Sequence, residues 1–215
     1  MDLKRNCRLL FIGDSITDCG RRYAAGADIS GNALGNGYVS LIAATLTASH
    51  PEYAVDVMNA GVSGNTIRDL EDRWERDVLA LHPNQLSVMI GINDVWQQID
   101  GMWGAGTPIS VDEFADTLDR LITRVLPTLE GLVLLTPYYL SPDKTDPMRK
   151  LMDEFGRAVL SLATSHRAVG VDTQAAFDKI MREVPPEKLA QDRVHVGLVG
   201  HMVLTQAFLK GIGYS

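Results

Sequence analysis

The chain has 215 residues, which is enough for one α/β domain with a substantial core. Hydrophobic residues make up 46% of the chain and charged residues 22%, an ordinary composition for a globular protein. The formal net charge of -7 argues against nucleic acid as a partner, because nucleic-acid-binding surfaces are basic. We therefore expect a single domain over residues 1–215.

The N-terminal stretch MDLKRNCRLLFIGDS does not resemble a signal peptide, because its apolar run is only four or five residues long. No segment approaches the ~18 consecutive apolar residues of a membrane span. Cys7 and Cys19 flank the first predicted strand, and we expect both to be reduced thiols. These features predict a cytoplasmic protein without a membrane partner.

The first part of the chain alternates apolar runs with helical periodicity. Residues 9–13 predict a buried strand that stops at a glycine, and residues 19–37 predict a long, polar, glycine-rich loop. A helix is expected over residues 38–49 and a second strand over residues 54–59. Apolar residues at helical spacing then predict a helix over residues 66–81.

The middle of the chain repeats this pattern. Residues 86–90 predict a third strand, and residues 94–108 predict a second long loop, which carries two of the three tryptophans. Ser110 is expected to start a helix through a capping box with Glu113, three residues further on. Residues 132–135 predict the fourth strand.

The last part contributes one more strand and three helices. Pro147 is well placed for a first helical turn, so a helix is expected over residues 148–166. Residues 168–171 predict the fifth strand and residues 172–181 another helix. A loop over residues 189–199 leads to a terminal helix, over residues 200–209.

Strands that alternate with helices form a parallel sheet with helices on both faces. The predicted strands are apolar at both alternating positions, as a sheet covered on both faces requires. The sequence therefore predicts an α/β protein with three α/β/α layers and five parallel strands.

Polar side chains follow the predicted strands, at the edge of the sheet where ligands bind in open α/β folds. They are Asp14 and Ser15, then Asn59, Ser63, Gly64 and Asn65, then Asn93 and Asp94, and from the last loop Asp192 and His195. Each group alone has an ordinary explanation as a turn, a helix cap or a surface ion pair. Their convergence on one edge favours a catalytic site.

A serine hydroxyl is a poor nucleophile unless a base lies beside it. His195 is the best candidate among five histidines, because Asp192 three residues earlier can hold its Nδ1–H while Nε2 faces Ser15. Attack on an ester also needs donors for the oxyanion. The amides of Ser15 and Gly64 and the side chain of Asn93 are the candidates.

Four segments resemble the sequence blocks of the SGNH or GDSL hydrolases and occur in the same order. They are Gly13-Asp14-Ser15-Ile16, Asn59 to Thr66 (NAGVSGNT), Gly91-Ile92-Asn93-Asp94 and Asp192-Arg193-Val194-His195. The resemblance implies a flavodoxin-like fold, a Ser-Asp-His triad, and no metal or other cofactor. By position, Ser15 is the implied nucleophile, His195 the base and Asp192 its partner, while Ser15, Gly64 and Asn93 form the oxyanion hole.

Nearly the whole chain is also similar to bacterial cytoplasmic acetyl xylan esterases of this superfamily, for example in SGNTIRDLEDRWERDVL and MIGINDVWQQ. That group implies removal of acetyl groups from xylo-oligosaccharides and assembly into a homo-oligomer. One departure is Val196, where the family usually has a proline. A proline would hold His195 in an extended conformation, so the change bears on the rigidity of that loop rather than on the triad.

Asp14, Trp96 and Trp103 are candidate substrate-binding residues. The two indole rings can stack on sugar rings, or they can pack the loop or an oligomer contact. No extended apolar stretch marks a channel for a long acyl chain, so a small acyl group is expected.

Other functions remain open. One is a broader short-chain esterase, thioesterase or lysophospholipase with the same machinery. Another is a non-catalytic carbohydrate-binding protein, although binding alone does not need a nucleophile with its base. A third is a metal-dependent hydrolase that uses Asp14, Asp18 and His195, although no compact His/Asp ligand motif is present in the sequence.

Overall fold

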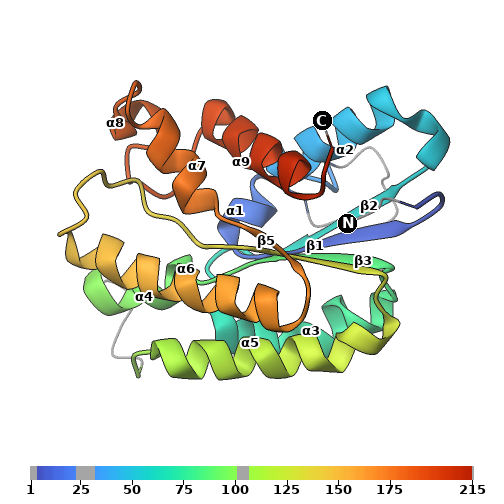
Figure 1. Cartoon of the computed structure of the whole chain (residues 1–215), viewed down its shortest axis with the longest axis horizontal. Helices are drawn as coiled ribbons and strands as arrows, with labels where there is room; N and C mark the ends of the chain where they lie inside the picture. Colours follow the sequence, from blue (N-terminus) through green and yellow to red (C-terminus); the bar gives the residue numbers. More distant parts are fainter. Residues whose placement is uncertain (1–3, 23–31, 101–106, 215) are drawn as a thin grey trace.

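A computed structural model describes residues 4–22, 32–100 and 107–214, which fold around a five-stranded parallel sheet (Figure 1). The strand order is β2-β1-β3-β4-β5, the order of flavodoxin-like folds. The strands are β1 (Arg8–Gly13), β2 (Asp56–Gly61), β3 (Gln85–Met89), β4 (Gly131–Leu135) and β5 (Val169–Val171). The order reverses beside β1, which is where such folds bind ligands. The predicted three-layer fold is confirmed.

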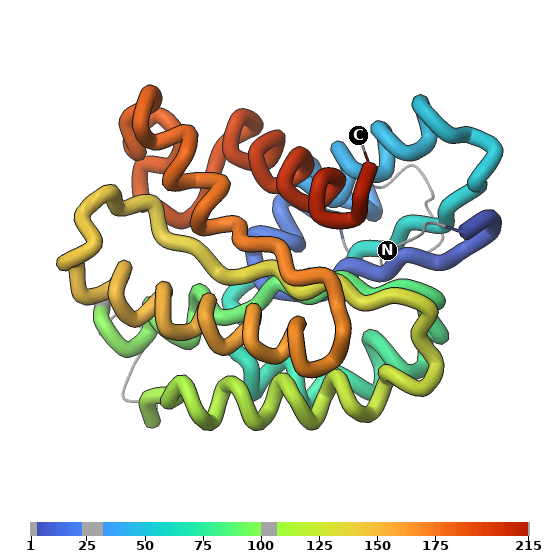
Figure 2. The backbone as a smooth tube through the Cα atoms, in the orientation of Figure 1, coloured from blue at the N-terminus to red at the C-terminus, as the bar shows by residue number. Residues whose placement is uncertain are grey.

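Helices cover both faces of the sheet, with α2, α7 and α9 on one face and α3, α5 and α6 on the other (Figure 1). Helices α2 and α9 pack side by side although they lie far apart in the sequence (Figure 2). The helices are α1 (Ser15–Asp18), α2 (Tyr38–Ser49), α3 (Ile67–Asp77), α4 (Ile92–Asp100), α5 (Val111–Val125), α6 (Pro147–Ser165), α7 (Thr173–Ile180), α8 (Pro186–Leu189) and α9 (Leu198–Gly211). Three short 3-10 turns are η1 (Pro51–Tyr53), η2 (Leu79–Leu81) and η3 (Leu126–Thr128).

Aromatic side chains fill the space between the sheet and the helices on both faces. Phe11 of β1 lies between Tyr38 of α2 and Phe208 of α9, with ring centroids 5.7 and 5.2 Å away. On the other face, Phe114 of α5 meets Phe155 of α6 at 4.8 Å. Each such ring contributes about 1.5–3 kcal/mol when it is fully buried. Strand β1, which precedes the candidate serine, is packed from both sides, since its side chains from Leu9 to Ile12 are fully buried.

Most predicted elements are present, and their boundaries differ where a local turn intervenes. Helix α2 has the predicted bounds. Strand β2 starts two residues later than predicted, because Ala54, which follows η1, has a φ of +46° that takes the chain out of the extended conformation. Helix α3 ends at Asp77, and η2 completes the predicted helical segment as a separate turn. Helix α9 begins two residues earlier than predicted and ends two residues later.

The capping box predicted at the start of α5 is only half formed. Ser110 Oγ accepts a hydrogen bond from the Glu113 N–H at 3.1 Å. The Glu113 carboxylate instead accepts two hydrogen bonds from Arg68 of α3, at 2.6 and 2.8 Å. A bidentate guanidinium is the stronger partner, so the carboxylate ties α5 to α3.

The predicted loop over residues 94–108 is wrong in its first part, which forms helix α4. Gly91, at φ +125°, allows the sharp turn from β3 into this helix. Ile92 and Val95 are buried at a spacing of three residues, so one face of the helix packs on the core. Polar residues between these positions obscured a short amphipathic pattern. The short helix α8, which Pro186 opens, was also missed.

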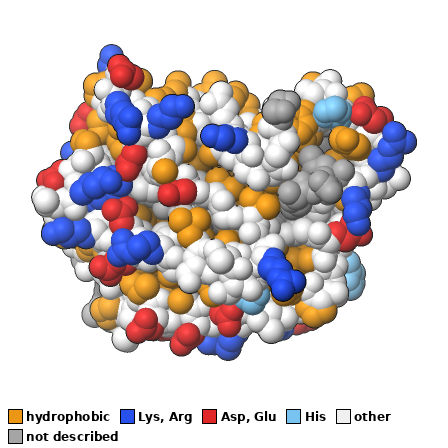
Figure 3. All heavy atoms as spheres, in the orientation of Figure 1, with side chains coloured by type: hydrophobic (Ala, Val, Ile, Leu, Met, Phe, Trp, Pro, Cys, Tyr) orange, Lys and Arg blue, Asp and Glu red, His pale blue; other side chains and the backbone are white. Residues whose placement is uncertain are grey.

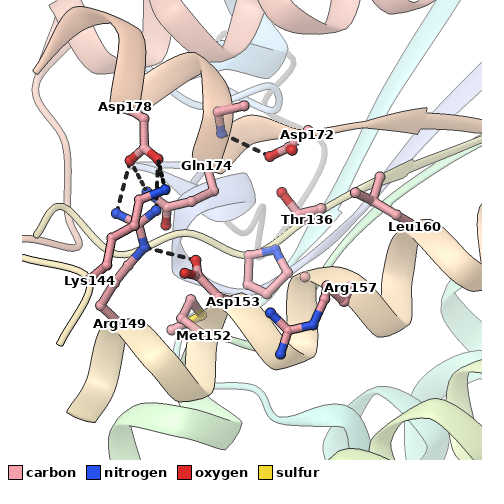
Figure 4. A pocket seen from close by; sticks show the side chains of 13 residues that line it. Thr136, Lys144, Arg149, Met152, Asp153, Arg157, Leu160, Asp172, Gln174 and Asp178 are labelled. Atoms are coloured by element: carbon pink, nitrogen blue, oxygen red, sulfur yellow. Dashed lines mark hydrogen bonds and ion pairs between the residues drawn. The ribbon is translucent and has the colours of Figure 1, made fainter. Parts of the chain in front are cut away.

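Helices α6 and α7 are joined by a buried guanidinium, that of Arg149 (Figure 4). Its side chain is 2% exposed and donates to Asp153 at 2.8 Å, to Asp178 at 2.7 and 2.9 Å and to the Ser141 carbonyl at 2.7 Å. The side chains beside it line a pocket of about 270 Å³. On the face seen in Figure 3, basic and acidic side chains are interspersed at the end of the molecule that carries α7 and α8.

Within the described ranges, no helix is both long enough and apolar enough to cross a membrane.

Candidate active site

Ser15 lies at the first turn of α1, directly after β1. Asp14 precedes it, and its carboxylate accepts the Ile16 N–H at 3.0 Å, which caps the helix. Gly13 permits this turn because a Cβ there would lie 2.1 Å from the Met89 carbonyl oxygen and 2.6 Å from Thr17 Oγ1. The close packing of β1, β3 and α1 therefore fixes where the serine hydroxyl emerges.

Three side chains from the two ends of the chain form a continuous hydrogen-bonded series. Ser15 Oγ lies 2.9 Å from His195 Nε2, and His195 Nδ1 lies 2.7 Å from Asp192 Oδ2. Because the carboxylate accepts the Nδ1–H, the Nε2 lone pair is left to face the serine. The structure thus brings together the three residues that the sequence analysis named.

Asp192 also shapes the turn on which His195 sits. Its Oδ1 accepts the N–H of Val194 at 3.0 Å and that of His195 at 2.8 Å. Burial opposes ionisation of this carboxyl, but the hydrogen bonds from the imidazole and the two backbone N–H groups outweigh it and lower the pKa of Asp192. The carboxylate is therefore ionised at neutral pH and can stabilise an imidazolium.

The loop that carries His195 is supported from the side of β4. Tyr138 Oη donates to the Val194 carbonyl at 2.8 Å, and the Leu140 N–H donates to the Arg193 carbonyl at 3.0 Å. Val196, in place of the usual proline, is 7% exposed and packs so closely on α9 that only a glycine fits at position 200. Packing and hydrogen bonds thus hold this loop.

The three candidate oxyanion donors come from neighbouring segments. Asn93 Nδ2 donates to the Asn65 carbonyl at 2.9 Å, which orients its amide beside the turn that contains Gly64. Gly64 is at φ +84°, a conformation that favours glycine, and a Cβ there would meet no atom within 4 Å. The Val62 N–H donates to the Gly13 carbonyl at 3.0 Å and ties this turn to the end of β1.

Two buried carboxyl groups flank these donors. Asp14 precedes Ser15, Asp94 follows Asn93, and each is 1% exposed. Burial, the largest effect, raises the pKa of both Asp14 and Asp94 to about 7. Asp94 Oδ1 accepts the Ile67 N–H at 2.9 Å and thereby ties α4 to the start of α3. Asp14 was predicted to contact substrate; in the structure its buried carboxylate caps α1, and a contact with substrate stays a prediction.

Trp96 lies beside the catalytic candidates. Its ring centroid is 5.7 Å from that of His195, with the planes tilted by 47°. The indole is half-buried on α4. Trp103 falls outside the described residues.

An open pocket of about 550 Å³ adjoins the triad on the side of α8. It is lined by Glu187, Lys188, Leu189, Ala190, Gln191, Asp192, His195 and Gly197. Its acidic, basic and amide side chains offer both donors and acceptors to a hydroxyl-rich ligand.

The other polar residues of the predicted edge have structural partners. Asn59 donates to the carbonyls of Thr17 and Leu34 at 2.7 and 2.9 Å, and Ser63 donates to Asp18 at 2.7 Å. In the part of the chain that the structure describes, no group of three or more His, Cys, Asp or Glu side chains is arranged to hold a metal ion.

His201 is buried where α9 meets α1 and α2. Its Nδ1 accepts the Tyr38 N–H at 3.2 Å, and its Nε2 lies 3.0 Å from Cys19 Sγ. Burial lowers the pKa of His201 to about 4, so the ring is neutral at physiological pH. This ring links the helix that carries Ser15 to the helix that follows His195.

The fold and this arrangement of serine, histidine and aspartate are those of an α/β/α hydrolase. The chain belongs to the GDSL-like lipase/acylhydrolase family, whose model matches residues 11–203. The family named from its sequence blocks is thus confirmed.

Individual relatives are similar over nearly the whole chain. An acetylxylan esterase from Geobacillus stearothermophilus is 47% identical over 208 residues, which cover 97% of this chain and 94% of that protein. The crystal structure of an acetylxylan esterase from that organism matches with a TM-score of 0.94 at 45% identity, over 100% of this chain and 98% of that one. An alpha/beta hydrolase enzyme from the metagenome of Lake Arreo, Spain, matches with a TM-score of 0.94 at 43% identity, over 98% and 97% of the two chains. Catalytic mutants of the Geobacillus enzyme have alanine in place of a serine, an aspartate or a histidine.

Proposed function

We propose that this protein is a serine esterase that removes O-acetyl groups from acetylated xylo-oligosaccharides or related sugars. The observation that carries the proposal is the series of hydrogen bonds from Ser15 through His195 to Asp192, with Nε2 2.9 Å from the serine oxygen. The 47% identity to an acetylxylan esterase supports the choice of substrate.

The proposed cycle has two similar halves. His195 Nε2 takes the Ser15 proton as Oγ attacks the acetyl carbonyl, and Asp192 stabilises the imidazolium. The same proton passes to the departing sugar oxygen and leaves an acetyl-enzyme. Water then gives a proton to His195 as its oxygen attacks the acetyl carbonyl. The bond between that carbonyl carbon and Ser15 Oγ breaks, His195 returns the proton to Oγ, and acetate leaves. This cycle needs no metal ion or other cofactor.

Each half passes through a tetrahedral oxyanion. We assign its donors to the amides of Ser15 and Gly64 and to the side chain of Asn93. The Asn93 contact with Asn65 supports this assignment, because it fixes the amide group before substrate arrives. Preorganised donors stabilise the developing charge without any reorganisation during the reaction.

The sugar is proposed to lie over Trp96 and the pocket beside α8. Trp96 supports this placement because its ring lies 5.7 Å from the His195 ring. The polar lining of the pocket matches the hydroxyl groups of a xylo-oligosaccharide. Trp103 remains a candidate for the same role. The alternative, a broader short-chain esterase, thioesterase or lysophospholipase, is not favoured, since a relative 47% identical in sequence is an acetylxylan esterase.

We further propose that residues 1–215 form one domain, and that the protein is cytoplasmic and assembles into a homo-oligomer. The resemblance of the sequence to bacterial cytoplasmic acetyl xylan esterases supports all three statements. Light scattering of the purified protein tests the oligomer, and a monomer at micromolar concentration would contradict it.

The experiment is acetate release from acetylated xylo-oligosaccharides, with p-nitrophenyl acetate and p-nitrophenyl octanoate as simple esters. Ser15→Ala should reduce turnover at least about 10³-fold, since removal of a triad nucleophile has costs of this order or larger. Ser165→Ala, which changes a serine at the end of α6, is the matched control and should keep wild-type turnover.

The possible outcomes separate mechanism from substrate. Activity on p-nitrophenyl acetate without activity on the acetylated sugar would overturn the substrate. Faster turnover of the octanoate would favour the broader esterase. Equal activity of Ser15→Ala and wild type would overturn the triad.

A further inference from the structure

Arg73 of α3 is buried beneath the candidate oxyanion hole. Its guanidinium donates from Nη2 to the Gly13 carbonyl at 2.8 Å and from Nη1 to the Ala60 carbonyl at 2.7 Å. Nε donates to Asn65 Oδ1 at 2.5 Å, and Nη1 also contacts Asp77 at 3.0 Å. One rigid group therefore contacts the ends of two strands and the turn that follows the second strand.

Each of these acceptors adjoins one of the three donors. Gly13 ends β1, directly before the Asp14–Ser15 peptide that supplies the first amide. Ala60 lies at the end of β2, from which the turn runs to Gly64. Asn65 follows Gly64, and its own carbonyl accepts the side-chain amide of Asn93.

We propose that Arg73 is the positioning residue of the oxyanion hole, which sets the relative placement of the Ser15 amide, the Gly64 amide and the Asn93 side chain. This inference rests on the proposed function. The guanidinium is suited to the task because its planar fork offers five donors in fixed directions, which the single ammonium of a lysine cannot reproduce.

Such a role has a kinetic signature that a purely structural role lacks. The oxyanion exists only in the transition states, so misplaced donors raise their free energy and leave substrate binding unchanged. Acylation and deacylation both pass through an oxyanion and slow together, so that kcat falls while KM stays. A misplacement of about 1 Å is enough for a loss of about 10²-fold.

Arg149 provides a matched control. Its side chain is 2% exposed and that of Arg73 is 7% exposed. Each donates to main-chain carbonyl oxygen and to an aspartate four residues further along its helix, Asp153 or Asp77. Arg149 joins α6 to α7 and lies outside the proposed hole, so Arg149→Lys reports the general effect of replacing a buried arginine (Figure 4).

The experiment compares Arg73→Lys, Arg149→Lys and wild type in the full chain. We measure kcat and KM for p-nitrophenyl acetate and the inhibition constant of methylboronic acid, which adds to a serine hydroxyl as a tetrahedral anion. Arg73→Lys should lower kcat about 10²-fold and weaken inhibition by the same factor, with KM within about threefold. Arg149→Lys should stay within about threefold of wild type in all three quantities.

Three results would overturn the assignment: equal losses in the two lysine variants, a loss confined to KM, or a fall in kcat with unchanged inhibition by the boronic acid. If Arg73→Lys does not fold, Asn65→Ala removes the Nε acceptor and leaves the arginine in place. This variant should lose about 10-fold in kcat with the same signature, and wild-type kcat would contradict the proposal.

Asn93→Ala separates this proposal from the proposed function. If Asn93→Ala keeps wild-type kcat, Asn93 is not part of the hole, and the proposed function loses that donor. If it loses about 10²–10³-fold while Arg73→Lys behaves like Arg149→Lys, the hole stands and only the role of Arg73 fails.

Discussion

Asp192→Asn isolates the proton-handling role of the acid from its role in the loop. The wild-type Oδ1 accepts the N–H groups of Val194 and His195 at 3.0 and 2.8 Å. In the variant, the amide oxygen of the asparagine should take the place of Oδ1, because the opposite orientation would point the amide NH2 at these two N–H donors. Its NH2 therefore faces His195 Nδ1, which must become an acceptor. The ring proton then moves to Nε2, 2.9 Å from Ser15 Oγ, so the imidazole cannot take the serine proton.

The expected loss follows from this change of tautomer. In a serine protease the same change lowers kcat about 10⁴-fold, which corresponds to about 5.4 kcal/mol. The Asp192 side chain is 41% exposed, so solvent screens part of its attraction to the imidazolium, while the effect of the wrong tautomer remains. We therefore expect kcat to fall about 10³–10⁴-fold.

The assay is turnover of p-nitrophenyl acetate at pH 7 to 9, with thermal unfolding measured beside it. Asp172→Asn is the matched control, because Asp172 also accepts a backbone N–H, that of Ala175 at 2.8 Å, but caps α7 away from the serine. The control should keep wild-type kcat, and both variants should unfold near the wild-type Tm. An Asp192→Asn variant within about tenfold of wild-type kcat would refute the tautomer argument.

Three further changes test other parts of the structure. Arg149→Met leaves Asp153 and Asp178 without their guanidinium and should lower the free energy of unfolding in urea by about 2–4 kcal/mol. The loss is smaller than for a fully buried pair because both carboxylates are 27% exposed. A loss below about 0.5 kcal/mol would contradict a stabilising role of Arg149 between α6 and α7. The pKa of Asp94 is raised to about 7 by burial, so the folded state binds more protons than the unfolded state between pH 4 and 7, and stability falls as the pH rises. Asp94→Asn removes this dependence, so the Tm difference, variant minus wild type, should become more positive from pH 5 to pH 8 in calorimetry; a constant difference would argue against the raised pKa. Trp96→Ala should raise KM for acetylated xylo-oligosaccharides about 2–10-fold and leave p-nitrophenyl acetate unchanged, and equal effects on both substrates would exclude sugar stacking.

The architecture could be predicted from the sequence because its strands are apolar on both faces and its helices have clear periodicity. The signals for helix starts were equally informative, since Ser110 accepts a backbone N–H at the start of α5 and Pro147 is the first residue of α6. The predictions that failed concern short helices with few buried positions. Among the described side chains of helix α4, the fully buried apolar ones are Ile92 and Val95, too few for a strong helical pattern.

The residues of the site could be located because parallel strands deliver their carboxyl ends to one edge. The side chains that hold these residues in place could not be located from the sequence. Arg73 lies in the segment LEDRWERD, where an arginine among charged residues is expected on the solvent-exposed face of an amphipathic helix. Tyr138 lies in a loop, where no periodic pattern indicates burial. Their roles depend on carbonyl oxygens from other elements, Gly13 and Val194, that meet them only in the folded chain.

The Ser15–His195 hydrogen bond joins residues 180 positions apart, and the intervening segments must all fold before these two groups meet. Closing so long a loop costs entropy, which the packing of α9 on α2, α7 and β5 helps to offset. During refolding, esterase activity should therefore return after the helical circular dichroism signal has been regained. Activity is thus a late reporter of folding in this protein, sensitive to the joining of its two ends rather than to the formation of its sheet.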